Sequence, residues 1–185
     1  MGDETGARES GPVAPGAGED TFDRRRRRVL WSMPSGLYLL GSAAPGRANL
    51  MTANWATQVA SDPKLVAVSV ETAAFTHRLI EEAGAFSVNV LARSDRAIVR
   101  RFVKPAVWDS EASTLNGFAV RTARTGAPIF VGAAGWLDCQ LVQASGLGSH
   151  TLFVGEVVDC GQGPQDGAGE VPVLRMEDTR MNYGG

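Results

Sequence analysis

"MTANWATQVASDPKLVAVSV", residues 51–70, alternates apolar and polar residues in its first half and then becomes almost wholly apolar. This pattern is typical of strands that bury one face or both faces in a core. The polar positions of the first half hold hydroxyls and amides, with neither Lys nor Glu: Thr52, Asn54, Thr57 and Gln58. Such side chains orient a bound group by hydrogen bonds and keep the surface neutral. The segment therefore predicts a strand with a neutral binding surface.

The length and composition of the chain indicate one ordinary globular domain. Its 185 residues can bury a substantial core, and 44% of them are hydrophobic and 21% charged. A net charge of −2 gives no general attraction to nucleic acid or to an anionic membrane. No apolar run approaches the ~20 residues that a membrane helix needs, and the first residues do not resemble a signal peptide. We therefore expect a cytoplasmic protein that binds neither nucleic acid nor membrane.

The two cysteines, Cys139 and Cys160, show no metal-ligand spacing. We expect both to be reduced thiols in the core, and we expect no metal site.

Both ends of the chain differ in composition from its middle. Residues 1–22 are rich in Gly, Pro, Ala and acids, which predicts disorder. The run Arg24–Arg28 that follows could contact nucleic acid or phosphate, or could be a solvated leader beside the acidic tail. The lack of reinforcing aromatic or basic residues favours the leader. The predicted parts are a tail over 1–28, a domain over 29–176 and a C-terminal tail over 177–185.

The middle of the chain is mainly strand-like. Six segments rich in apolar and β-branched residues are punctuated by Gly, Pro and Asp, and a seventh is long enough for two or three strands. They are residues 36–42, 48–60, 64–71, 85–92, 118–124, 171–176 and the long segment 129–160.

Two other segments have apolar residues at helical spacing, 72–86 and 94–103. Thr72 or Thr76 could cap the first helix, Gly84 could end it, and Ser94 could cap the second. Many strands with two short helices predict a closed or nearly closed barrel with helices packed outside it.

Four stretches, in this order, resemble the flavin reductase-like family: MPSGLYLLGS (33–42), MTANWATQVASDPKLVAVSVE (51–71), FTHRLIEEAGAFSVNVL (75–91) and GSHTLFVGEVVD (148–159). The resemblance covers residues 30–176. It implies a mainly β fold, an antiparallel split β-barrel of Greek-key type with two or more short peripheral helices. It also implies a flavin reductase that transfers hydride from NADH or NADPH to FMN or FAD and that could supply reduced flavin to a monooxygenase.

The resemblance also assigns site residues. The neutral segment would lie along the flavin ring and hydrogen-bond its polar edge, and Trp55 would either cover the ring or pack in the barrel. The phosphate would lie where the next strand leads into a helix, with Arg100, Arg101 and Lys104 as further sources of positive charge. The cofactor-binding residues predicted in this way are Thr52, Ala53, Asn54, Trp55, Thr57, Ser69, Val70, Thr76 and His77.

His150 is the predicted catalytic residue. A lone histidine at the start of a strand is more often structural, but the resemblance implies that this one faces the flavin and helps to seat the nicotinamide. The chain has no G-x-G-x-x-G fingerprint, so a nicotinamide cofactor would bind without a Rossmann domain. Tyr183 in the C-terminal tail could fold over the mouth of the flavin site.

The resemblance further implies a homodimer whose sites are completed by the neighbouring chain. Leu37, Leu39, Trp136 and Phe153 could supply the apolar interface, or they could fill the barrel. Three other functions stay open: a flavin-binding electron carrier that accepts no hydride, a barrel for another ligand such as heme or a deazaflavin, and an inert barrel with a nucleic-acid-binding arm at Arg24–Arg28.

Overall fold

The computed structural model describes residues 17–163 and 171–179, which belong to two compact units. The first unit contains helix α1 (Ala17–Trp31), so the prediction of disorder is wrong for residues 17–22. Composition did not predict this helix, because it does not register pairs at helical spacing. Asp23 pairs with Arg26 at 2.6 Å and with Arg27 at 2.7 Å, three and four residues along the chain. Pairs at this spacing stabilise a helix, and arginine has a high helix propensity. Residues 1–16 lie outside the described residues.

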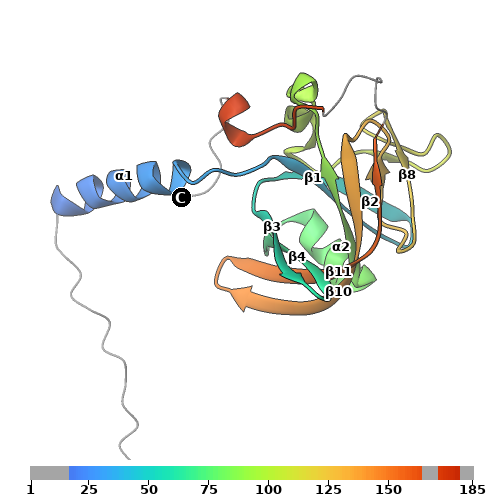
Figure 1. Ribbon diagram of the computed structural model, residues 1–185, viewed down its shortest axis with the longest axis horizontal. Helices are drawn as coiled ribbons and strands as arrows, with labels where there is room; N and C mark the ends of the chain where they lie inside the picture. The colour runs from blue at the N-terminus through green and yellow to red at the C-terminus, as the bar shows by residue number, and fades with distance from the viewer. Residues whose placement is uncertain (1–16, 164–170, 180–185) are drawn as a thin grey trace, which may run out of the picture. The chain divides into compact units, whose positions relative to one another are not determined.

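The second unit, Pro34–Met181, is built on a seven-stranded antiparallel sheet with the spatial order β2-β1-β5-β10-β11-β4-β3 (Figure 1). Its strands are β1 (Tyr38–Ala44), β2 (Arg47–Ala53), β3 (Ala56–Ser61), β4 (Lys64–Glu71), β5 (Ala85–Val90), β10 (Gly135–Leu147) and β11 (His150–Gln162). Strands β2 and β3 occupy opposite edges although only Asn54 and Trp55 separate them in the chain. The sheet must therefore curl until its edges meet at this link, and it forms the predicted split β-barrel.

Shorter elements complete the unit. A four-stranded sheet contains β6 (Trp108–Asp109), β7 (Thr114–Leu115), β8 (Phe118–Arg121) and β9 (Ile129–Phe130). The helices are α2 (Phe75–Ala83) and the 3₁₀ turns η1 (Arg93–Asp95), η2 (Ile98–Phe102) and η3 (Met176–Asp178). Helix α2 packs against β1 and β2 (Figure 1).

The predicted helix ends are only partly confirmed. Gly84 ends α2 in the left-handed conformation with a φ of 62°, as its lack of a side chain allows. The N-cap of α2 is Ala74, and neither Thr72 nor Thr76 caps it. The expected helix over 94–103 is two 3₁₀ turns, and Ser94 lies inside the first of them.

Two apolar clusters lie on opposite faces of the sheet. The inner cluster fills the barrel and contains Leu40, Val66, Val68, Val70, Ile80, Phe86, Val88, Cys139 and Phe153. The outer cluster packs β1 and β2 against η2 and the small sheet, and includes Leu37, Leu39, Val99, Phe102 and Phe130. The four residues proposed for a dimer interface are all buried within the chain, so they fill its interior. Cys139 is buried as expected, whereas Cys160 is exposed and not a core thiol.

Residues 171–179 form a strap across one end of the unit. The Leu174 N–H donates to the Leu91 carbonyl, and the Leu174 carbonyl accepts from the Leu37 N–H. The strand expected at 171–176 is reduced to two isolated bridges, Gly36 to Arg175 and Ala92 to Val173.

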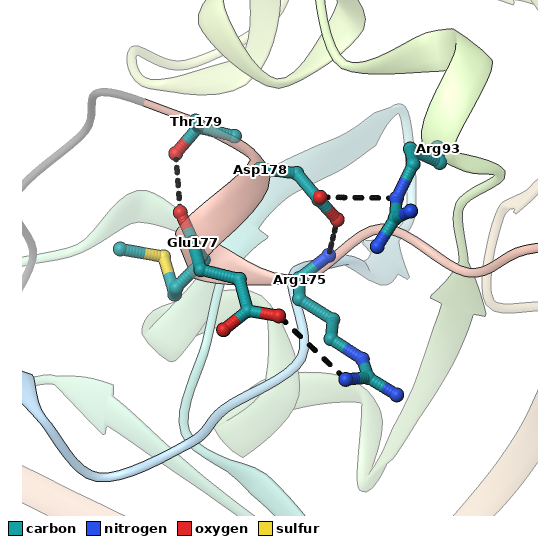
Figure 2. Close-up of polar contacts among 6 residues, drawn as sticks. Arg93, Arg175, Glu177, Asp178 and Thr179 are labelled. Atoms are coloured by element: carbon teal, nitrogen blue, oxygen red, sulfur yellow. Dashed lines mark hydrogen bonds and ion pairs between the residues drawn. The ribbon is translucent and has the colours of Figure 1, made fainter.

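Figure 2 shows how Asp178 fixes this strap: one carboxylate oxygen lies 3.0 Å from Arg93 Nε and the other accepts from the Arg175 N–H at 3.0 Å. Tyr183 lies outside the described residues.

Candidate functional site

The outer face of strands β3, β4 and β11 forms a neutral surface, which we call the platform. Residues paired across neighbouring strands point to the same face, and Thr151 and Phe153 point inward. The residues of β11 that alternate with these two, and the residues paired with them on β4 and β3, therefore point outward. They are Thr57, Ala67, Ser69, His150, Leu152 and Val154. The Ser69 N–H donates to the Trp55 carbonyl at 3.0 Å, which adds Trp55 to this surface. Two exposed carboxylates lie at the ends of this face: Glu71, opposite His150, and Glu156, opposite Leu65.

Trp55 and His150 meet at one end of the platform. Their ring centroids lie 5.0 Å apart with the planes tilted by 51°. Trp55 is 43% exposed, so its ring lies at the surface and does not pack inside the barrel. His150 Nδ1 lies 2.9 Å from the Ser149 hydroxyl, which leaves Nε2 available to another group. The pair offers a flat apolar surface beside one polar nitrogen.

Two more predicted residues lie on the platform and one lies at its edge. The Thr57 hydroxyl is exposed and bonds only weakly, at 3.3 Å, to the Gln58 carbonyl. Ser69 is half-buried in the middle of the platform, next to the small and buried Ala67. Asn54 is half-buried in the link between β2 and β3, and its amide has no hydrogen-bond partner within residues 17–163 or 171–179. These groups keep hydrogen-bonding capacity that a ligand could use.

Three of the predicted cofactor residues point away from the platform. Thr52 is buried and its hydroxyl donates to the Val99 carbonyl at 2.7 Å. Ala53 packs against the inner cluster and Val70 belongs to it. The alternation of the sequence placed Thr52 on a polar face, but η2 covers that face and uses the hydroxyl internally.

The side chains of Thr76 and His77 are also used inside the protein. Thr76 is fully buried and accepts a hydrogen bond from Asn49 Nδ2 at 2.7 Å, while Asn49 Oδ1 accepts from the Ala106 N–H at 2.7 Å. His77 is 5% exposed, and its Nε2 lies 2.8 Å from the Thr151 hydroxyl. The structure therefore does not offer these two side chains to a phosphate. Only the backbone N–H groups of the first turn of α2 have that capacity.

Asn49 is a buried polar residue that sequence reasoning missed. It joins β2 to the first turn of α2 and to the loop that follows η2. The signal was an amide between apolar Ala48 and Leu50 in a segment otherwise interpreted as a half-buried strand. A buried amide is retained only where partners satisfy it.

Positive charge near the first turn of α2 comes from the exposed Arg78 of that helix and from one basic segment. Arg100, Arg101 and Lys104 are exposed, and none forms an ion pair with another described residue. Both ends of the segment are held to β2, through the bond from Thr52 to the Val99 carbonyl and the bond from the Ala106 N–H to Asn49. Burial raises the pKa of Tyr38, which pairs with Ala53, so its phenol stays neutral near pH 7.

Two negative observations concern other kinds of site. In the described part of the chain, no group of three or more His, Cys, Asp or Glu side chains is placed to hold a metal ion. None of the helices there combines the length and apolar character needed to span a membrane.

Comparison with known proteins gives consistent results. The family model described as "Flavin reductase like domain" matches residues 30–182. The chain is 34% identical, over 133 residues, to a ferric-chelate reductase (NAD(P)H) of Archaeoglobus fulgidus, a match covering 71% of this chain and 78% of the relative.

Two solved structures are also similar. The chain shares 32% identity and a TM-score of 0.67 with BorF, the flavin reductase component of a bacterial two-component tryptophan halogenase, over 77% of this chain and 89% of BorF. It shares 27% identity and a TM-score of 0.63 with the styrene monooxygenase flavin reductase of Pseudomonas putida S12, over 74% of this chain and 85% of that one.

Proposed function

The chain belongs to the flavin reductase-like family, and on this basis we propose that it reduces a flavin, FMN or FAD, with NADH or NADPH. The nicotinamide gives up a hydride and becomes oxidised, and the flavin takes up that hydride and a proton from solvent. The observation that carries the proposal is the neutral platform with the Trp55–His150 pair at its end.

The residues of the platform fit a flavin ring. The ring is flat and uncharged when oxidised, and the small side chains of Ala67 and Ser69 allow it to approach the strands closely. Asn54, Thr57 and Ser69 supply hydrogen-bonding groups for its polar edge without placing a charge there. A charge at that edge would shift the electronic properties of the flavin. These three side chains meet that requirement, and the carboxylates of Glu71 and Glu156 lie at the ends of the platform.

The protein contributes positioning to the reaction. A bound flavin supplies the hydride acceptor. Trp55 covers apolar ring surface and excludes water from it, and His150 Nε2 hydrogen-bonds the carboxamide of the nicotinamide. No side chain has to accept or donate a proton in the hydride step, so the rate depends on holding the two rings in contact and in register.

The phosphate of the flavin requires positive potential, which the structure supplies in two places. One is the first turn of α2, where backbone N–H groups attract an anion. The other is the segment with Arg100, Arg101 and Lys104, whose charges are not neutralised by described carboxylates. We assign the phosphate to these groups and not to the side chains of Thr76 and His77.

Absorbance of the nicotinamide, followed with each combination of NADH or NADPH and FMN or FAD, tests the activity. Oxidation of the nicotinamide that depends on flavin is the expected result, and no turnover with any combination would refute the proposal. Replacing Trp55 by Ala (W55A) should weaken flavin binding about tenfold, because a lost aromatic contact costs about 0.5–1.5 kcal/mol beyond its buried area. Replacing the equally exposed Val131 by Ala (V131A) is the matched control and should leave binding unchanged.

We also propose a homodimer, now on residues other than those first expected. Val142 and Leu147 are each more than half exposed on β10, the strand next to the platform strand β11. A second copy would cover these apolar side chains and one edge of the platform. Light scattering should show a dimer that L147E converts to a monomer, while V131E, a charge at an exposed valine elsewhere, should not. A wild-type monomer that still binds flavin stoichiometrically would contradict this part of the proposal.

The two structural relatives support a partner for the product. Both are flavin reductases of systems named for a halogenase or a monooxygenase, and we propose that this chain supplies reduced flavin to a monooxygenase. Its two free thiols fit the cytoplasmic location that we assign to it.

A further inference from the structure

His150 is held through both of its neighbours in the chain. The Ser149 carbonyl accepts hydrogen bonds from the Thr72 N–H at 3.0 Å and from the Thr72 hydroxyl at 3.2 Å. On the other side, the Thr151 hydroxyl lies 2.8 Å from His77 Nε2. Thr72 follows β4 and His77 lies in α2, so one segment of chain fixes both neighbours. The place of the His150 ring therefore depends on residues that are not part of the platform.

His77 is a buried group for which the proposed reaction has no use. Its ring lies 5.0 Å from the ring of Phe153, and its Nδ1 lies 3.3 Å from a carboxylate oxygen of Glu81, one helical turn along. A carboxylate only accepts, so this contact favours the tautomer with its proton on Nδ1. The other nitrogen, Nε2, then accepts a hydrogen bond from the Thr151 hydroxyl. The result is a hydrogen bond between Thr151 and His77, with the Glu81 carboxylate close to the other ring nitrogen.

A carboxylate, an imidazole and a hydroxyl in this order also make up nucleophilic triads. Here the hydroxyl cannot serve as a nucleophile, because Thr151 is 8% exposed and faces the barrel interior. What the arrangement can do is fix the start of β11 against α2.

We propose that His77 is a positioning residue for His150. Alternation along β11 places Thr151 inward and His150 outward, so a bond that fixes Thr151 also fixes the direction in which His150 leaves the strand. The His77–Thr151 hydrogen bond thereby sets the His150 ring against Trp55. The inference rests on the proposed function, because the part that His150 plays in seating the nicotinamide belongs to that function.

Nuclear magnetic resonance of the full-length, flavin-free protein tests the contact chain without any turnover. The sequence has two histidines, so ¹⁵N-histidine labelling gives two imidazoles to assign, and the variant W55F identifies the indole signal of Trp55. In the wild type, His77 should show a single tautomer with its proton on Nδ1. In T151V, which keeps the shape but removes the hydroxyl, that signature should be lost and the His150 and Trp55 signals should both shift.

Two controls separate positioning from general loosening of the fold. T151S keeps the hydroxyl and should keep all three wild-type signals. S42A removes another buried hydroxyl, one that donates to the Ala85 carbonyl at 2.8 Å, and should leave the Trp55 and His150 signals in place. If T151V does not fold, H77Q and H77L replace it: the glutamine amide can accept from Thr151 and the leucine cannot.

The proposal is overturned if the Trp55 and His150 signals stay where they are in T151V although the His77 signature is lost, or if they stay where they are in H77L. It is overturned equally if His77 carries its proton on Nε2 in the wild type. In the active enzyme, T151V should lower kcat by more than it raises the KM for flavin, and T151S should restore kcat. A chain that proved to have no reductase activity would leave the resonance result standing, so failure of the function and failure of the inference can be told apart.

Discussion

Replacing Asn49 by Ala (N49A) should destabilise the barrel unit by removing two hydrogen bonds at once. Asn49 is 2% exposed, and its amide bonds the Thr76 hydroxyl and the Ala106 N–H, each at 2.7 Å. Both partners lose a bond, and a buried polar group without a partner costs about 1–3 kcal/mol. The Ala106 bond is only partly buried, so we take the lower part of that range for each partner. The two penalties together give a total of about 2–4 kcal/mol. This is a large share of the roughly 5–15 kcal/mol that stabilises a typical domain.

Urea unfolding followed by circular dichroism measures this loss. With a slope of about 2 kcal/mol/M, the midpoint should fall by about 1–2 M. The control is S42A, which removes one buried hydroxyl bond and should cost about 1 kcal/mol. If the midpoint of N49A is no lower than that of S42A, Asn49 does not join the three segments energetically and the reasoning is refuted.

Three further predictions concern single groups. H150A should lower kcat for flavin reduction about tenfold, which is the equivalent of one lost hydrogen bond. Flavin affinity, measured by fluorescence titration, should change little. A wild-type kcat would contradict the role of His150. At pH 8 only Cys160 should react with a chromogenic disulfide, because burial raises the pKa of the Cys139 thiol to about 12. Unfolding in guanidinium should make the second thiol reactive. Two reactive thiols in the native protein would contradict the buried placement of Cys139. A backbone N–H that bonds Asp178 lowers the pKa of its carboxyl below the unfolded value of about 3.9. Its stabilising effect is therefore present above that pH and is lost as the pH falls through the folded value, so amide exchange across residues 171–176 should lose protection in that range but not at pH 6.

Local patterns were enough to place most strands. The segment 64–71 was expected from its apolar run and is β4, and the long segment 129–160 does contain two long strands, with a turn at Gly148 where φ is 68°. The type of barrel came from the family resemblance, and the order of the strands in the sheet was not predicted. It could not come from periodicity, because pairing between distant strands depends on the whole barrel.

The candidate site was predicted less well than the fold. Trp55 and His150 were both named, but their contact joins residues far apart in the sequence and is visible only in the structure. Thr76 and His77 were assigned to a phosphate because polar residues at a helix start often bind anions. Their spacing from Ile80 also fits the buried face of α2, and burial decides their role. For a polar residue in an amphipathic helix, it must therefore be decided whether it lies on the buried or the exposed face before a ligand is assigned to it.

The position of the β10–β11 hairpin has a consequence for synthesis of the protein. The hairpin is made after the other strands of the barrel, yet it lies in the middle of the sheet, between β5 and β4. Before the ribosome has released residue 162, the chain can form two separate pieces, β2-β1-β5 and β3-β4, and each has a free edge where the hairpin will pair. Free edges of this kind can pair with other chains. Nascent or truncated chains should therefore aggregate more readily than the finished protein, and under the proposed function they should not hold a flavin, because the platform includes residues of β11.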